Sequence, residues 1–257
     1  MRVLPICNRK GGVGKTATAA NLGHALALRG RRVLVIDWDP QANLTTHIGR
    51  DDRPEDAPTI ADVFLAPSRT TEAVSQSVAS GVDLIYGSTA LAEAERQILV
   101  ANHSAPGLIL TRILKRLEPL GYDYVLVDSP NGDGQLVRNA LIAAPELLVP
   151  LQTEYAGMEG LGILRRLVHE LVEQDALQER PKMLVFAAMV DERTRSGRSL
   201  KELALQIPGT SPLRSVVHRN APIHDAYGAK QTVFDYARSS RGATEYAALA
   251  EEIDHDG

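Results

Sequence analysis

The stretch Lys10-Gly11-Gly12-Val13-Gly14-Lys15-Thr16 decides the fold, because it joins the apolar run Val3–Cys7 to the helical pattern Thr16–Arg29. Glycines let successive backbone N–H groups turn toward one anion, and the helix N-terminus adds positive potential there. The spacing predicts a phosphate-binding loop in which Lys15 reaches the β- and γ-phosphates of a nucleotide and Thr16 offers a hydroxyl to Mg²⁺. The residues expected to contact the nucleotide here are Lys10, Gly11, Gly12, Val13, Gly14, Lys15, Thr16 and Ala17.

Acidic residues that follow two other apolar runs support this prediction. Asp37 and Asp39 come after Val33–Ile36, and Asp128 comes after Tyr124–Val127. In an open parallel sheet a ligand lies beyond the carboxyl ends of the strands, so these carboxylates are expected beside the loop. We expect Asp128 to hold Mg²⁺ from its outer shell. Asp37 is a second candidate for the metal, and Asp37 or Asp39 is expected to orient an attacking water.

Short, nearly continuous apolar runs recur along the chain, at Val3–Cys7, Val33–Ile36, Val82–Tyr86, Tyr124–Val127, Leu147–Leu151 and Met183–Val190. Such runs are typical of strands buried on both faces of a parallel sheet. Helical patterns occur at Thr16–Arg29, Met158–Val172 and Thr244–Ile253, and Gly30 suits the left-handed position after the first of them. The alternation predicts an α/β fold with a doubly wound, mostly parallel sheet flanked by helices. Pro5 lies inside the first run and has no N–H to donate, so the hydrogen bonding there must be altered.

The composition is that of a globular chain, with 44% hydrophobic and 23% charged residues, and we expect one domain over residues 1–257. Cys7 is the only cysteine, which excludes an internal disulfide and an iron–sulfur cluster. No run approaches the roughly 18–20 apolar residues of a membrane span, and polar residues interrupt any signal peptide, so we expect a cytoplasmic protein. The net charge of -4 gives no overall attraction to nucleic acid.

Several motifs together resemble the ParA/MinD group of P-loop ATPases, whose loop is a deviant Walker A motif. The loop begins with Lys10, and the first acidic cluster reads Asp37-Trp38-Asp39-Pro40-Gln41. Further matches favour the ParA branch and extend over almost the whole chain: Asn21-Leu22-Gly23, Gln41-Ala42-Asn43-Leu44-Thr45, Gln152-Thr153-Glu154-Tyr155, Glu159-Gly160-Leu161 and Ser239-Ser240-Arg241-Gly242-Ala243. Two departures are Ala17, where threonine is frequent, and the stretch Asp128–Gly134, which lacks a second proline.

The resemblance implies a short ParA protein, without an N-terminal DNA-reading domain, that uses ATP and Mg²⁺. It implies that Lys10 crosses to the nucleotide of a second copy, so that a homodimer encloses two ATP molecules. Lys10, Lys15 and Asp39 would then be the catalytic set, with Asp39 positioning water. Hydrolysis would be slow until a ParB-like adaptor stimulates it.

Members of the ParA branch bind DNA nonspecifically as ATP dimers, which would place this protein on the nucleoid. Basic residues between Arg193 and Arg219 outnumber the one acidic residue, Glu202; they are Arg193, Arg195, Arg198, Lys201, Arg214 and Arg219. Arg193 and Arg219 lie where the family places DNA-contacting arginines, and contacts of this kind go to phosphates without reading sequence. The resemblance also suggests that Asn220 contacts adenine. A solvated basic surface is the alternative interpretation of this segment.

Three other functions stay open. A ParA-like ATPase could position a protein cargo or organelle instead of a chromosome or plasmid. A biosynthetic ligase of the same fold would use ATP to activate a carboxylate and would need no DNA. A binding module without hydrolysis is a third possibility. A MinD-type membrane cycle is disfavoured, because Glu251, Glu252, Asp254 and Asp256 make the last residues acidic and unsuited to anionic lipid.

Overall fold

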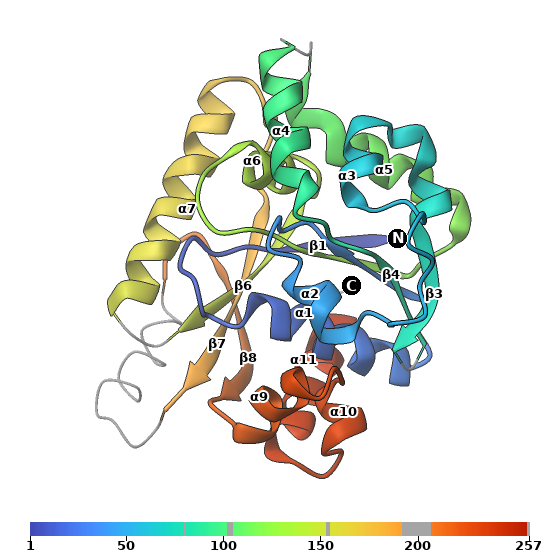
Figure 1. Cartoon of the computed structure of the whole chain (residues 1–257). Coiled ribbons are helices and arrows are strands. Elements are labelled where there is room, and N and C mark those ends of the chain that lie inside the picture. The colour runs from blue at the N-terminus through green and yellow to red at the C-terminus, as the bar shows by residue number, and fades with distance from the viewer. Residues whose placement is uncertain (80, 102–104, 153–154, 192–206, 256–257) are drawn as a thin grey trace.

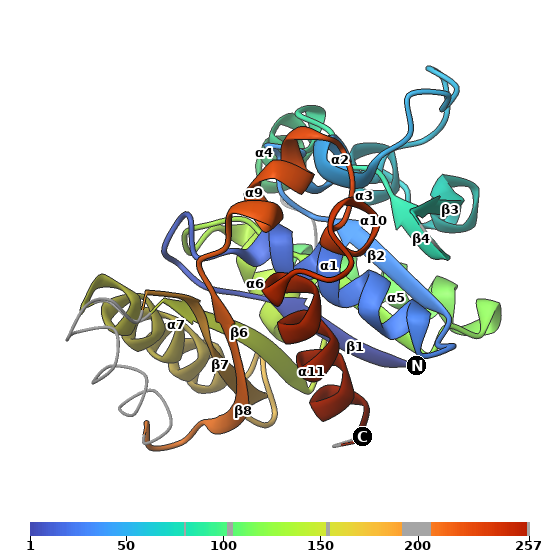
Figure 2. The same ribbon diagram turned by 90° about the horizontal axis from the view of Figure 1, so that it is seen from below.

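The computed structural model describes residues 1–79, 81–101, 105–152, 155–191 and 207–255. Within these residues, eight strands form one sheet in the order β3-β4-β2-β5-β1-β6-β7-β8 (Figures 1 and 2). All neighbours are parallel except β3 and β4. The strands are β1 Arg2–Ile6, β2 Val33–Asp37, β3 Val74–Ala79, β4 Val82–Ile85, β5 Tyr124–Asp128, β6 Glu146–Gln152, β7 Lys182–Val190 and β8 Ser211–His218. The predicted α/β fold with a doubly wound, mostly parallel sheet is confirmed.

Helices cover both faces of the sheet, each over its own hydrophobic layer. One layer is buried under α3 Ile60–Leu65, α4 Ala90–Val100, α5 Ile109–Leu117, α6 Gln135–Ile142 and α7 Tyr155–Glu173. The other is buried under α1 Lys15–Leu28, α2 Asn43–Ile48, α9 Ala221–Gly228, α10 Val233–Tyr236 and α11 Arg241–His255. Short 3₁₀ turns occur at Pro67–Ala73, Pro106–Leu108 and Glu118–Leu120. The six predicted apolar runs are six of the strands, and the three predicted helices are α1, α7 and α11, with ends within three residues of those expected.

Pro5 is accommodated because β1 pairs unequally with its two neighbours. Five residues of β1 are in register with β5, but only Ile6 is in register with β6, opposite Leu148. The N–H of Cys7 donates to the carbonyl of Leu148 at 3.0 Å. Because alternate residues of a strand direct their N–H groups to the same side, the missing N–H of Pro5 faces β6, where the ladder is short. The expected change in hydrogen bonding is therefore confined to one edge of β1.

Two glycines in left-handed conformation set the ends of α1. Gly14 precedes the helix with φ of 88°, and Gly30 follows it with φ of 80° and donates its N–H to the carbonyl of Ala27 at 2.9 Å. Residues with a side chain adopt such φ values at a cost, which explains glycine at both positions. Between them, a Cβ on Gly23 would lie 3.1 Å from Val35 of β2, so α1 lies very close to the sheet. This close packing fixes the N-terminus of α1 above the carboxyl end of β1.

Candidate nucleotide site

The predicted phosphate loop connects β1 to α1 and forms one end of a cavity of about 690 Å³. Gly12, Gly14, Lys15, Thr16 and Ala17 line this end of the cavity. The other walls come from the carboxyl ends of β2, β5, β7 and β8 and from α2 and α9. They contain Asp39, Asn43, Asn131, Met189, Arg219, Asn220, Ala221, Ile223, His224 and Tyr227. The cavity therefore lies at the sheet edge where an open parallel sheet places its ligand.

Lys15 is the first residue of α1, and its side chain lies deep in this site. It is 7% exposed, and its Nζ donates to Oδ1 of Asn131, in the loop that follows β5. Burial lowers the pKa of Lys15, and the nearby charge of Asp128 opposes that shift. Because a buried ammonium requires an anionic partner, the position of Lys15 suits a polyphosphate. Asn131 was not among the predicted site residues, and its only sequence signal is its place three residues after Asp128.

Asp128 ends β5 and lies directly opposite Asp37 of β2 in the strand register. It is 1% exposed, and within the described part of the chain neither carboxylate oxygen has a hydrogen-bond partner. Burial raises the pKa of Asp128 to about 8, repulsion from Asp37 adds to the rise, and Thr16 and Lys15 act against it. Unpaired buried oxygens beside the Thr16 hydroxyl have the donor chemistry that Mg²⁺ prefers, so these residues fit the metal. The described residues contain no group of three or more His, Cys, Asp or Glu side chains that could hold a metal.

Asp37, the other predicted metal residue, already has partners in the backbone. Its Oδ2 accepts the N–H of Thr45 at 2.7 Å, and its Oδ1 accepts the N–H of Asp39 at 3.4 Å. The hydroxyl of Thr45 in turn accepts the N–H of Gly87 at 2.6 Å, and a Cβ on Gly87 would lie 2.5 Å from the Asp37 carboxyl carbon. Burial raises the pKa of Asp37 to about 6 despite these hydrogen bonds. The geometry supports a role in holding the loop after β2, and direct metal binding by Asp37 stays a prediction.

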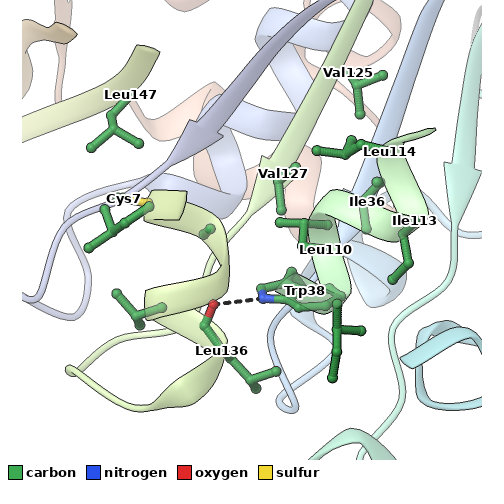
Figure 3. Close-up of a cluster of buried hydrophobic side chains, with 14 of the residues drawn as sticks. Cys7, Ile36, Trp38, Leu110, Ile113, Leu114, Val125, Val127, Leu136 and Leu147 are labelled. Carbon is green, nitrogen blue, oxygen red and sulfur yellow. Dashed lines mark hydrogen bonds between the residues drawn. The ribbon is translucent and has the colours of Figure 1, made fainter. Parts of the chain in front are cut away.

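Asp39 lines the cavity, whereas Trp38 between the two acidic residues points into the core. The Asp39 Oδ1 accepts the N–H of Gln41 at 2.9 Å, which shapes the turn that leads into α2. Figure 3 shows Trp38 among buried side chains, with its indole N–H directed at the Leu136 carbonyl, 2.9 Å away. The side chains of consecutive residues in an extended segment point to opposite sides. Asp39 can therefore face the ligand while Trp38 packs into the core.

Lys10 begins the phosphate loop but is not among the residues that line the cavity, and it contacts β6 and α7. Its Nζ donates to Oε1 of Gln152 at 2.8 Å, and its backbone N–H donates to Oδ1 of Asn8 at 3.0 Å. Asn8 is 2% exposed and donates to the carbonyl of Pro150 at 2.8 Å. A Cβ on Gly160 of α7 would lie only 2.7 Å from the Asn8 oxygen, so α7 can approach the loop because residue 160 is glycine. The roles of Asn8 and Gly160 were not anticipated from the sequence.

The remaining predicted residues lie at the other end of the cavity or outside the described residues. Asn220 precedes α9, and its buried Oδ1 has no hydrogen-bond partner within the described part of the chain. Arg219 also lines the cavity, and its backbone N–H donates to the carbonyl of Val190 at 3.0 Å. Arg193 lies outside the described residues. Among the helices described, none is long and apolar enough to cross a membrane.

Comparisons with known proteins agree with this geometry. A family model described as AAA domain matches residues 1–181. The chain is 31% identical to the sporulation initiation inhibitor protein Soj of Bacillus subtilis, over 100% of this chain and 99% of the relative. It is 33% identical to the chromosome partitioning protein ParA of Caulobacter vibrioides, over 98% of this chain and 94% of the relative. A crystal structure of cobyrinic acid a,c-diamide synthase from Mycobacterium smegmatis with bound ADP and magnesium superposes with a TM-score of 0.80, at 29% identity, covering 99% of this chain and 94% of that one.

Proposed function

Because this chain belongs to the ParA/MinD-type P-loop ATPases, we propose that it is an ATP-driven switch that binds DNA and positions a cargo on it. The ATP-bound state is a homodimer with nonspecific affinity for DNA. Hydrolysis, stimulated by a ParB-like adaptor, ends that state. The observation that carries the proposal is the placement of two lysines on one phosphate loop, with Lys15 in the cavity lining and Lys10 outside it, hydrogen-bonded to Gln152.

Within the site, the loop N–H groups and Lys15 bind the phosphates of ATP. Thr16 and Asp128 hold Mg²⁺, which neutralises phosphate charge during the reaction. The bound ADP and magnesium in the related M. smegmatis structure support these two cofactors. Asn220 lines the opposite end of the cavity, where the base would lie, and is the predicted adenine contact.

The dimer depends on Lys10, whose ammonium donates a hydrogen bond to the side-chain amide of Gln152. A charge-assisted hydrogen bond from Lys10 to a phosphate is stronger than its hydrogen bond to Gln152. A monomer can bind one triphosphate with the loop N–H groups and one lysine. The second lysine is then available to bind the nucleotide of the partner copy. Asp39, which lines the cavity, positions the attacking water.

A cationic hollow on α7 supports contact with DNA. Arg165, Arg166, His169 and Arg180 line a hollow of about 280 Å³, and Arg180 lies 3.2 Å from the His169 ring nitrogen. Three of these residues are arginines, whose charges an anion would neutralise, and phosphodiester groups are the anions that DNA supplies. Arg219 and Arg193 stay predicted DNA contacts. Arg219 lines the nucleotide cavity, so its contribution to DNA binding depends on the bound nucleotide.

A specific observation also favours one rival function. The superposed M. smegmatis structure is of a diamide synthase, which represents the ligase alternative. A ligase would turn over ATP in proportion to a carboxylate or amine substrate and would show no ATP-dependent affinity for DNA.

One binding experiment separates the two functions. Anisotropy of a labelled random-sequence duplex is measured with Mg²⁺ and ATP, Mg²⁺ and ADP, or Mg²⁺ alone, across a salt series. The switch is supported if tight, salt-sensitive DNA binding occurs with Mg²⁺ and ATP but not in the other two conditions. Equally weak DNA binding in all three conditions contradicts it. Replacing Arg165 and Arg166 by alanine tests the α7 hollow, with Lys115 and Arg116 on α5 as the control pair of equal charge. The α7 change is expected to reduce the slope of log Kd against log salt by about 0.9 for each DNA phosphate that the variant no longer neutralises.

A further inference from the structure

One stripe of α9 faces the nucleotide cavity along its whole length. Asn220, Ile223, His224 and Tyr227 all line the cavity, at the spacing of one helix face. The phosphate loop occupies the other end, so α9 forms the wall farther from Lys15. Met189 of β7 joins this wall, with φ of 53° and its side chain 3.7 Å from where a Cβ of Gly14 would lie. This end of the cavity combines apolar surface with an aromatic ring, which is the chemistry that holds a planar base.

Tyr227 is the aromatic residue of that wall, and α2 supports its ring from behind. The ring centroid lies 5.0 Å from that of His47, at an interplanar angle of 53°. The Tyr227 hydroxyl donates to Oδ1 of Asn43 at 3.5 Å, so both contacts are to α2. Tyr227 itself is 37% exposed, which leaves part of the ring open to the cavity.

His47, which packs behind Tyr227, is buried and uncharged. It is fully buried, and its Nε2 lies 2.9 Å from the carbonyl oxygen of Gln231. Burial lowers the pKa of His47 to about 4, so the ring behind Tyr227 is neutral at physiological pH. The packing of this neutral ring against Tyr227, together with the Asn43 contact, restricts the rotation of Tyr227 and presents its open surface in one orientation.

We propose that Tyr227 stacks on the nucleobase and couples an occupied base site to the loop that carries Asp39. This inference rests on the proposed binding of ATP. The coupling passes through α2, which begins four residues after Asp39 and holds Thr45 against Asp37. Bound base against Tyr227 stabilises the ring, the ring stabilises α2, and α2 keeps the Asp37–Thr45 contact that shapes the loop.

In this site the affinity for any base and the preference for one base come from different residues, Tyr227 and Asn220. Every base has a π face, so stacking on Tyr227 contributes similarly to ATP and GTP. The unpaired Oδ1 of Asn220 can accept a hydrogen bond from the amino group of adenine, which guanine replaces with a carbonyl at that ring position. Loss of Tyr227 therefore weakens the binding of both nucleotides and leaves the ratio of their affinities unchanged.

Calorimetric titration of three variants with Mg²⁺ and ATP, GTP or inorganic tripolyphosphate tests the stacking. Tyr227→Leu is expected to bind ATP and GTP about tenfold more weakly than the unchanged protein. Its affinity for tripolyphosphate should be unchanged. Tyr227→Phe retains the ring and should stay within about twofold of the unchanged protein. Tyr236→Leu is the control, because Tyr236 is 46% exposed on α10 and is not part of the cavity wall. Unchanged ATP affinity in Tyr227→Leu overturns the inference, and so does an equal loss for tripolyphosphate, which would indicate a disturbed fold.

The coupling has its own readout, because Trp38 is the only tryptophan and lies between Asp37 and Asp39. Saturating ATP should change the fluorescence emission of Trp38 in the unchanged protein and in Tyr227→Phe. In Tyr227→Leu the change in emission should be less than half as large. A full response in saturated Tyr227→Leu overturns the coupling. If the unchanged protein binds tripolyphosphate and ATP equally, the base has no site and the inference fails while the phosphate loop stands. If it binds neither, the proposed function itself fails.

Discussion

Lys10 Nζ donates to Gln152 Oε1 over 2.8 Å, which joins the phosphate loop to the carboxyl end of β6. Lys15, five residues later, donates to the side-chain amide of Asn131. In each of these two hydrogen bonds the acceptor is an amide oxygen, which competes weakly with a phosphate for an ammonium. Each of these two hydrogen bonds can therefore be replaced by a hydrogen bond to a phosphate oxygen.

Gly160→Ala is expected to impair dimerisation and to spare ATP binding by the monomer. The added Cβ would lie 2.7 Å from the Asn8 oxygen that holds the backbone of Lys10, so the rim of the loop must move while Lys15 stays in place. We expect dimer affinity to fall about tenfold or more, since one misplaced charge-assisted hydrogen bond costs about 1.5–3 kcal/mol. Gly162→Ala, two residues along the same helix, is the control, because its Cβ meets nothing closer than 3.9 Å. Equal behaviour of the two variants in sedimentation with ATP would contradict the assignment.

Lys15→Ala is expected to weaken ATP binding about 100-fold, because charge-assisted hydrogen bonds to phosphate are worth up to about 3 kcal/mol. Titration with a fluorescent ATP analogue measures the change. Lys115→Ala, on the last turn of α5, removes the same charge away from the site and should leave affinity unchanged. Stable ATP binding by Lys15→Ala would remove the basis for placing the triphosphate in this loop.

Asp39→Ala is expected to hold the protein in its ATP-bound dimer, because the attacking water loses its acceptor while Lys10 and Lys15 remain. Single-turnover hydrolysis should slow about 100-fold, the usual scale for loss of a positioned proton acceptor. Asp39→Asn is the companion variant, since its amide oxygen can still accept the N–H of Gln41 and preserve the turn. Hydrolysis at the normal rate in both variants would show that another group positions the water.

His47 predicts a pH dependence of stability. Its pKa is about 4 in the folded protein and about 6.5 when unfolded, so its contribution is present above pH 6.5 and is lost as pH falls toward 4. The loss amounts to at most about 3 kcal/mol. The free energy of unfolding, measured in urea between pH 7 and pH 4.5, should therefore fall less steeply for His47→Leu. His224→Leu is the control, because that side chain is 92% exposed. Parallel pH profiles for His47→Leu and the unchanged protein would contradict the assignment.

Much of the fold could be predicted because six strands are buried enough on both faces to read as apolar runs. The two strands that were not predicted, β3 and β8, lie at the sheet edges, where one side needs no neighbour. In β8, exposed Pro212 and Arg214 alternate with buried Leu213, so no continuous run exists. The antiparallel pairing of β3 with β4 likewise leaves no apolar signature.

The site was predictable only where its chemistry is local in sequence. The phosphate loop, Asp39 and Asp128 belong to short motifs beside strands, and the structure places all of them at one end of the sheet. The partners of the lysines are far away in the chain, since Lys10 and Gln152 are 142 residues apart. The contact of Tyr227 with His47 is equally long-range, because only the packing of α9 on α2 brings the two rings together. Sequence spacing carries no information about such pairs.

The most direct test of the proposed nucleotide-dependent dimer is the mass of the protein in solution with Mg²⁺ and ATP, Mg²⁺ and ADP, or Mg²⁺ alone, measured by light scattering. The chain has a mass of 27.8 kDa, and we predict twice that mass with ATP only. Lys10→Ala should bind ATP and remain at the single-chain mass. A protein that stays monomeric with bound ATP, or a Lys10→Ala variant that dimerises as readily as the unchanged chain, would contradict the claim that Lys10 completes the site of a second copy.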